Sequence, residues 1–222
     1  MAPLVPEFDQ PTSSEVRALV VDAVRAAAEL IADRQTAVAW NEPSVLDGMT
    51  VGALSAHLLR AAGATVAYLD RTPADARPGD DLLTPVTYFR AALEAPIHDR
   101  IKGVSAEEAA IGPDATAAAC RHLVDTLATR LAEEPEDRLV GALGGRMLTL
   151  DDFCRTRLIE VLLHVDDLAC SVGLPRPDLD RRGARVVASI LVGIAADRHG
   201  EWGLLHALAR VERADPDVFP IL

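Results

Sequence analysis

Apolar residues recur every three or four positions along most of the chain, a period typical of α-helices that bury one face. In the first periodic segment, residues 13–40, Val16, Leu19, Val20 and Val24 fall on one side of a helix. Ser14 lies two residues before Val16, and its hydroxyl can accept a hydrogen bond from a free backbone N–H. The pattern therefore predicts an amphipathic helix with Ser14 as its N-cap.

Prolines, glycines and aspartates divide the rest of the chain into further helical segments. Thr50 is the expected N-cap of the second segment, and either Thr149 or Asp151 begins a long segment that stops near Gly173. The predicted helices cover residues 51–69, 86–104 with a break at Pro96, 115–134, the region from 149 or 151 to about 173, 180–198 and 201–210.

Other segments are less regular. Ser105 followed three places later by Glu108 predicts a capping box. Residues 135–150 fit either a long loop or a short hairpin that turns at Gly144–Gly145. Residues 1–12 contain three prolines and are expected to form an extended arm. The chain ends on apolar residues, which indicates that the tail docks onto the body of the protein.

We therefore expect one domain over residues 1–222, all-α, built around a four-helix bundle with extra short helices at the C-terminus. The composition supports this fold class, because Ala, Leu and Val dominate while aromatic residues make up 4% of the chain. Half of the residues are hydrophobic, which is enough to bury a sizeable core.

The chain is acidic, with a formal net charge of -12. Nucleic acids and anionic membrane surfaces attract basic proteins, so both are excluded as expected partners. The N-terminus has no secretory signal pattern, and no apolar run reaches the ~20 residues that span a bilayer. With three widely spaced cysteines, these features predict a cytoplasmic protein with reduced thiols. Cys154 and Cys170 are expected to pack as small apolar residues.

The segment 158–168 carries an unusual stripe of polar residues in an otherwise apolar helix. At 100° per residue, His164 lies about 40° and Asp167 about 20° from Glu160 around the helix axis. Apolar residues flank this stripe, while a second polar sector with Arg155 and Asp166 lies far round the helix. A helix on the surface needs only one polar sector, so the stripe calls for another explanation.

A carboxylate among apolar residues needs a compensating positive charge. One candidate is Arg157, which lies on the same side one turn earlier, and the other is a divalent metal ion. Glu160 and His164 are four residues apart and can reach one ion together, but a site needs at least a third ligand. His57 shares a face with apolar neighbours and is the third candidate. A hydrogen-bonded core histidine remains the alternative.

Two segments resemble a known family. They are WNEPSVLDGMTVGALSAHLLR at residues 40–60 and RLIEVLLHVDDLA at residues 157–169. Together they resemble the mycothiol-dependent maleylpyruvate isomerase family of the DinB/YfiT-like superfamily. The shared features are a Trp, a Pro-Ser turn, a His seven residues after the helix-starting Thr, and an Arg followed by Glu-x-x-x-His-x-x-Asp-Leu. Where the family commonly has a second Trp, this chain has Met49.

The resemblance implies a four-helix bundle that holds a divalent metal, commonly zinc, with His57, Glu160 and His164 as ligands. It also implies mycothiol, the low-molecular-weight thiol of actinobacteria, as co-substrate. Asp167 is expected to orient a ligand or act as a base, unless it only caps or pairs locally. Arg157 is expected either to bind an anionic substrate or to pair with Glu160.

The function expected from these features is a metal- and thiol-dependent transferase or isomerase whose partners are a thiol and an electrophilic small molecule. A homodimer is an open possibility for its assembly. One alternative is a non-catalytic bundle that binds a metal or another ligand and takes part in a stress response. Another is a purely structural bundle in which His57 and Glu160 form hydrogen bonds.

Overall fold

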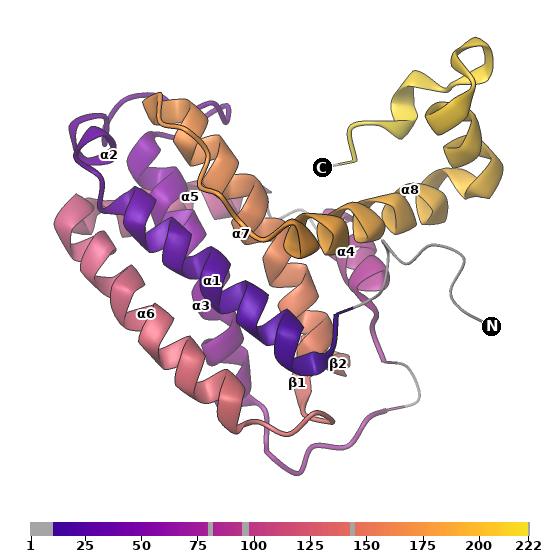
Figure 1. Ribbon diagram of the computed structural model, residues 1–222, viewed down its shortest axis with the longest axis horizontal. Coiled ribbons are helices and arrows are strands. Elements are labelled where there is room, and N and C mark those ends of the chain that lie inside the picture. Colours follow the sequence, from indigo (N-terminus) through magenta and orange to yellow (C-terminus); the bar gives the residue numbers. More distant parts are fainter. Residues whose placement is uncertain (1–10, 80–81, 95–97, 143–144, 222) are drawn as a thin grey trace.

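Four long helices form the body of the protein in the computed structural model, which describes residues 11–79, 82–94, 98–142 and 145–221. They are α1 (Ser13–Ile31), α3 (Val51–Arg71), α6 (Pro113–Glu133) and α7 (Leu150–Val172). Both α1 and α3 pack against α6 and against α7, so the four helices enclose a common core (Figure 1). The predicted all-α four-helix bundle is confirmed.

The ends of the bundle helices follow from side chains that satisfy free backbone groups. Thr50 caps α3 as predicted, and Thr149, one of the two predicted alternatives, caps α7; each accepts a hydrogen bond from a backbone N–H three residues on. Gly173 ends α7 in the left-handed conformation, with φ of 69°. The predicted cap Ser14 is wrong, because Thr12 caps α1 in a capping box whose acidic partner is Glu15.

The core lies between the four helices and consists mainly of aliphatic side chains. The apolar face predicted for α1 is buried as expected. Where α3 packs against α7, several large side chains are almost completely inaccessible to solvent, namely Leu54 and Leu58 of α3 and Phe153, Leu158 and Leu168 of α7. Burial of each such side chain contributes about 1.5–3 kcal/mol to folding, so these residues fix the relative rotation of α3 and α7.

Shorter helices connect the long ones and pack around them. The segment predicted as one helix over residues 13–40 divides into α1 and α2 (Arg34–Val38), because Asp33 caps a new helix start. The interrupted segment forms α4 (Pro85–Glu94) and α5 (His98–Glu108), and Pro96 lies outside the described residues. The turn η2 (Ala109–Ile111) then leads into α6.

Two side chains of α5 do not form the capping box that was predicted for them. Ser105 lies inside the helix, where its hydroxyl donates to the carbonyl of Ile101, so it caps nothing. Glu108 instead forms an ion pair with Arg60 of α3, at 3.4 Å. The predicted capping box is therefore wrong, because both side chains serve contacts with other parts of the protein.

Residues 135–150, for which a loop and a hairpin were both open, form a hairpin. Strands β1 (Leu139–Gly141) and β2 (Met147–Thr149) are antiparallel, with Val140 opposite Leu148. The structure leaves residues 143–144 of the predicted turn undescribed. Strand β2 runs directly into α7, so the hairpin fixes where that helix begins.

The C-terminal region is one bent helix and a short return segment. Helix α8 (Arg181–Ala209) bends at Gly200, whose φ of 73° explains the predicted break. The turns η4 (Val211–Arg213) and η5 (Pro216–Val218) follow. Val218 and Ile221 are buried, and Arg198 of α8 donates to the carbonyl of Ile221. The tail is therefore docked, but on α8 and not on the four-helix body as predicted. Its contacts are with α8, and this region projects from the bundle (Figure 1).

Among the described residues, no helix is both long and apolar enough to cross a lipid bilayer.

Candidate metal centre

Three side chains from two distant segments meet where α3 lies beside α7. The Nε2 atoms of His57 and His164 are each 3.7 Å from Oε2 of Glu160. One potential ligand atom from each residue lies within 4.8 Å of the other two. The two imidazole rings approach edge to face, with centroids 4.8 Å apart. The structure thus brings together all three residues that were predicted as ligands.

The sequence places these groups by simple helix geometry. Glu160 and His164 are one turn apart on α7, so both project from the same side of that helix. On α3, the buried residues Leu54 and Leu58 turn one face into the core and hold His57 at its edge. The site therefore depends on the rotation of two helices and needs no loop to shape it.

The three residues fit the requirements of a zinc ion. With bonds of 2.0–2.2 Å in a tetrahedral arrangement, neighbouring ligand atoms lie roughly 3.4 Å apart. The two spacings of 3.7 Å lie close to this value. All three ligand atoms lie within 4.8 Å of one another, so binding of zinc requires the side chains to move closer together. The side chains remain 14–24% exposed, so the cluster is open to small molecules from solvent.

Glu160 is held in its charged form by its surroundings. Burial by itself raises the pKa of this carboxyl, but the hydrogen bond from the His57 imidazole, the positive charge of Arg157 and the nearby His164 imidazole outweigh burial and lower the pKa to about 2. An ionised carboxylate beside two imidazoles is a donor set that suits a divalent cation.

Asp167 lies behind His164 on the same helix. Its Oδ2 is 2.9 Å from Nδ1 of His164, which places the N–H of that ring on Nδ1 and directs the Nε2 lone pair toward Glu160. Carboxylates that hold metal-binding histidines in this way are a common feature of zinc sites. The geometry suits the predicted orienting role of Asp167, and that role stays a prediction.

Replacing Asp167 with alanine is expected to weaken zinc binding by about 10- to 100-fold, because the His164 ring loses the partner that fixes its orientation. Asp167→Asn keeps an oxygen acceptor without the charge and should lose less. Competition titration with a chromophoric chelator measures both constants. Asp166→Ala is the matched control, since its carboxylate faces Arg176 and not the cluster. Equal losses in the Asp166 and Asp167 variants would contradict the assigned role.

Arg60 is a neighbour of the cluster that sequence reasoning missed. Its guanidinium donates to Nδ1 of His57 at 3.0 Å and to the hydroxyl of Ser105 at 2.8 Å. Because arginine only donates, Nδ1 accepts, and a neutral ring then carries its proton on Nε2. Binding of a cation through Nε2 therefore requires Arg60 to release the ring. The i, i+3 spacing of the two residues was the one available signal.

Arg157 occupies a buried position beside the cluster, 5% exposed. Its guanidinium contacts the hydroxyls of Thr156 and Tyr88 and lies 4.8 Å from the centre of the Phe153 ring. Within the described part of the chain, no carboxylate lies within 4.0 Å of it, so the direct pairing with Glu160 that was one of its two predicted roles is absent. The guanidinium acts on Glu160 only at longer range.

The cysteines differ in accessibility. Cys120 and Cys154 are buried, and burial raises the pKa of each thiol to about 12. Cys170 is exposed, so the prediction that it packs as an apolar residue is wrong. The two buried thiols stay protonated at neutral pH and are unsuited to act as nucleophiles.

We expect Ellman's reagent at pH 8 to modify one thiol per folded chain rapidly, and three per chain in urea. The reason is that the raised pKa and burial of Cys120 and Cys154 suppress the reactive thiolate, whereas Cys170 is accessible. A Cys170→Ser variant should remove the fast phase completely. Two or more fast thiols in the folded protein would contradict the burial described above.

One family model covers this site. The model described as the mycothiol maleylpyruvate isomerase N-terminal domain matches residues 17–169, more than half of the 222 residues. The matched region includes α3 and α7 and therefore His57, Glu160, His164, Asp167 and Arg157. No curated protein and no solved structure gives a significant match to the chain.

Proposed function

The chain belongs to the mycothiol maleylpyruvate isomerase N-terminal domain family, and from this premise we propose that it is a divalent-metal-dependent enzyme acting with a low-molecular-weight thiol. The proposed metal is zinc, the proposed thiol is mycothiol, and the second substrate is a small electrophile. The observation that carries the proposal is the approach of His57, Glu160 and His164, whose potential ligand atoms lie within 4.8 Å of one another.

In the proposed site, His57 and His164 offer neutral nitrogens, and Glu160 offers a charged oxygen. Three protein ligands leave a coordination position open, which is typical of catalytic zinc sites. A bound zinc ion supplies Lewis acidity that lowers the pKa of a thiol beside it. Asp167 keeps the His164 ring in the orientation that ligation needs. The buried charge of Arg157 favours negative charge near the cluster and attracts an anionic substrate.

The proposed reaction is transfer of the thiol sulfur to carbon. The sulfur forms a bond to the electrophilic carbon, the leaving group departs with the bonding electrons, and the thiol proton passes to solvent. An isomerase reaction begins instead with an addition: the sulfur forms a bond to one carbon of an activated double bond, and the π electrons move onto the conjugated carbonyl group. Rotation about the resulting single bond and elimination of the thiol then return the double bond in the other configuration.

The experiment is a metal and activity assay on protein purified without a polyhistidine tag. We expect about one zinc per chain and turnover of 1-chloro-2,4-dinitrobenzene with mycothiol, detected by absorbance. Both should be lost in Glu160→Ala and retained in Glu136→Ala, whose side chain lies in the exposed segment before the hairpin. Well under one metal per chain after reconstitution would refute the metal site.

A second candidate is a non-catalytic bundle that binds a metal or another ligand. The hydrogen bond from Arg60 to His57 opposes metal ligation by that ring, so it favours the form of this candidate in which the bundle binds a ligand other than a metal. Stoichiometric zinc without turnover of any electrophile, tested with mycothiol, glutathione and cysteine, would favour this function over the enzyme.

A further inference from the structure

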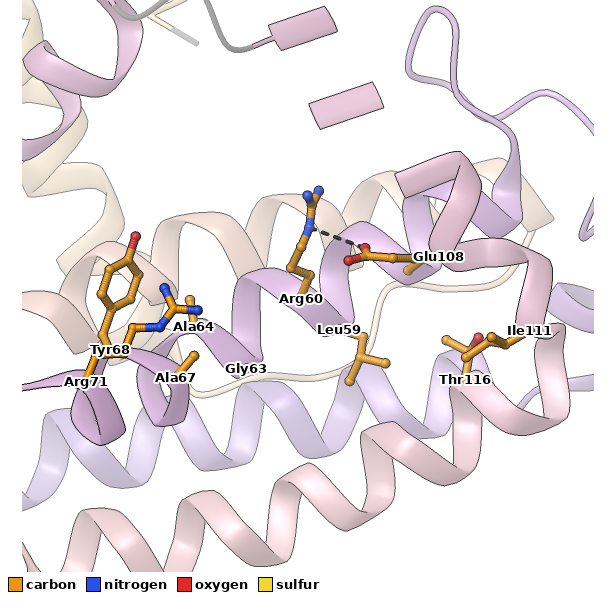
Figure 2. Close-up of a pocket in the computed structure, with 11 residues that line it drawn as sticks. Leu59, Arg60, Gly63, Ala64, Ala67, Tyr68, Arg71, Glu108, Ile111 and Thr116 are labelled. Carbon is orange, nitrogen blue, oxygen red and sulfur yellow. Dashed lines mark ion pairs between the residues drawn. The ribbon is translucent and has the colours of Figure 1, made fainter. Parts of the chain in front are cut away.

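A groove runs along the outer side of α3, beginning beside the candidate metal centre. Its volume is about 610 Å³, within the range of small-molecule sites. Residues of α3 line one side, and Glu108, Ile111 and Thr116 line the other (Figure 2). Arg60, which donates to His57, stands at the end of the groove nearest the centre, and Arg71 stands at the far end of α3.

The floor of the groove consists of residues with small side chains, namely Gly63, Ala64 and Ala67 (Figure 2). Packing does not require a glycine at residue 63. A Cβ there would meet only the side chain of Leu123, at an ordinary contact distance of 3.7 Å. A glycine inside a helix costs about 0.5–1 kcal/mol relative to alanine. The missing side chain therefore deepens the groove at the expense of helix stability.

The charged groups of the groove favour an anionic ligand. Arg71 lies over the ring of Tyr68, at 5.9 Å from its centre, and no described carboxylate lies within 4.0 Å of its guanidinium. Arg60 adds a second positive charge, partly balanced by Glu108 (dashed line in Figure 2). Two arginines in one groove contrast with the net charge of -12 for the whole chain. A guanidinium is well suited to bind a carboxylate with two hydrogen bonds.

We propose that this groove binds a small organic carboxylate, with its apolar body on Ala64 and Ala67 and its carboxylate on Arg71. The ligand lies along α3, with its other end directed toward Arg60. The binding event itself needs no metal and is tested separately.

The test is isothermal titration calorimetry of the metal-free protein with 4-phenylbutyrate and with its neutral amide, 4-phenylbutanamide. The acid is expected to bind about tenfold more tightly than the amide, because only the acid forms a charge-assisted pair with Arg71. Arg71→Gln should remove this difference. Arg185→Gln is the matched control on α8, where the side chain is exposed and away from the groove, and it should preserve the difference.

A second pair of variants tests the place of binding. Ala67→Leu should fill the floor and weaken both ligands, whereas Ala128→Leu on the exposed side of α6 should change neither. His57→Ala should lose zinc but still bind the acid, so failure of the metal site and failure of the groove give different results. Equal affinity for acid and amide, no saturable binding, or full binding in Ala67→Leu would overturn the proposal.

Discussion

Replacing His57 with alanine is expected to lower the affinity for zinc by more than about 100-fold. Loss of a residue that only supports a ligand costs 10- to 100-fold in such sites, and loss of a direct ligand should cost more. In the variant, Glu160 and His164 remain one turn apart on α7, but α3 contributes no ligand. Two ligands on one helix cannot complete a site that needs at least three.

The measurement is the zinc content after dialysis, together with the melting temperature at increasing zinc concentration. Zinc at 100 times its dissociation constant should stabilise the native protein by about 2.7 kcal/mol, and the variant should show almost no shift. His122→Ala, an exposed position on α6, is the matched control and should behave like the native chain. A His57→Ala variant that retained one zinc per chain with affinity within tenfold of the native value would refute the proposed centre.

Replacing Arg17 with alanine is expected to lower the free energy of unfolding by about 3–5 kcal/mol, because it breaks a buried ion pair and leaves its partners without hydrogen bonds. The Nε of Arg17 donates to Asp151 at 2.8 Å. Its other nitrogens donate to the carbonyls of Leu131, Glu134 and Pro135, where α6 ends. One side chain of α1 therefore ties together the end of α6 and the start of α7.

Urea denaturation followed by circular dichroism measures this loss. Arg25→Ala is the matched control, since Arg25 also lies on α1 and pairs with Asp22, but both side chains are at least half exposed. An exposed pair contributes about 0–1 kcal/mol, so this variant should be nearly as stable as the native protein. Similar losses for the Arg17 and Arg25 variants would contradict the role assigned to the buried pair.

Much of the fold and part of the site could be predicted because both depend on local spacing. Helical periodicity and capping threonines located α3 and α7, and the same periodicity placed Glu160, His164 and Asp167 in one stripe. That His57 faces this stripe depends on how two helices pack, so spacing alone left it open. The resemblance to a family supplied the connection, and the structure brings the three groups together.

The remaining features depend on contacts between residues far apart in the sequence, which periodicity does not report. Arg60 was assigned no role, yet it joins His57 to Ser105 and to the groove. Arg17 looked like any polar residue of an amphipathic helix, and its burial arises only when α6 ends against it. The capping box expected at Ser105 failed for the same reason, because partners on α3 compete for both side chains.

The candidate centre draws all of its proposed ligands from two regular helices, and this limits which length changes related chains can tolerate. One residue inserted between Glu160 and His164 would swing the second imidazole about 100° around α7, out of reach of His57. Residues added between α7 and α8 would not change the spacing of Glu160 and His164 on α7. Across orthologues, insertions and deletions should therefore accumulate in the connections and be absent from the interior of α3 and α7.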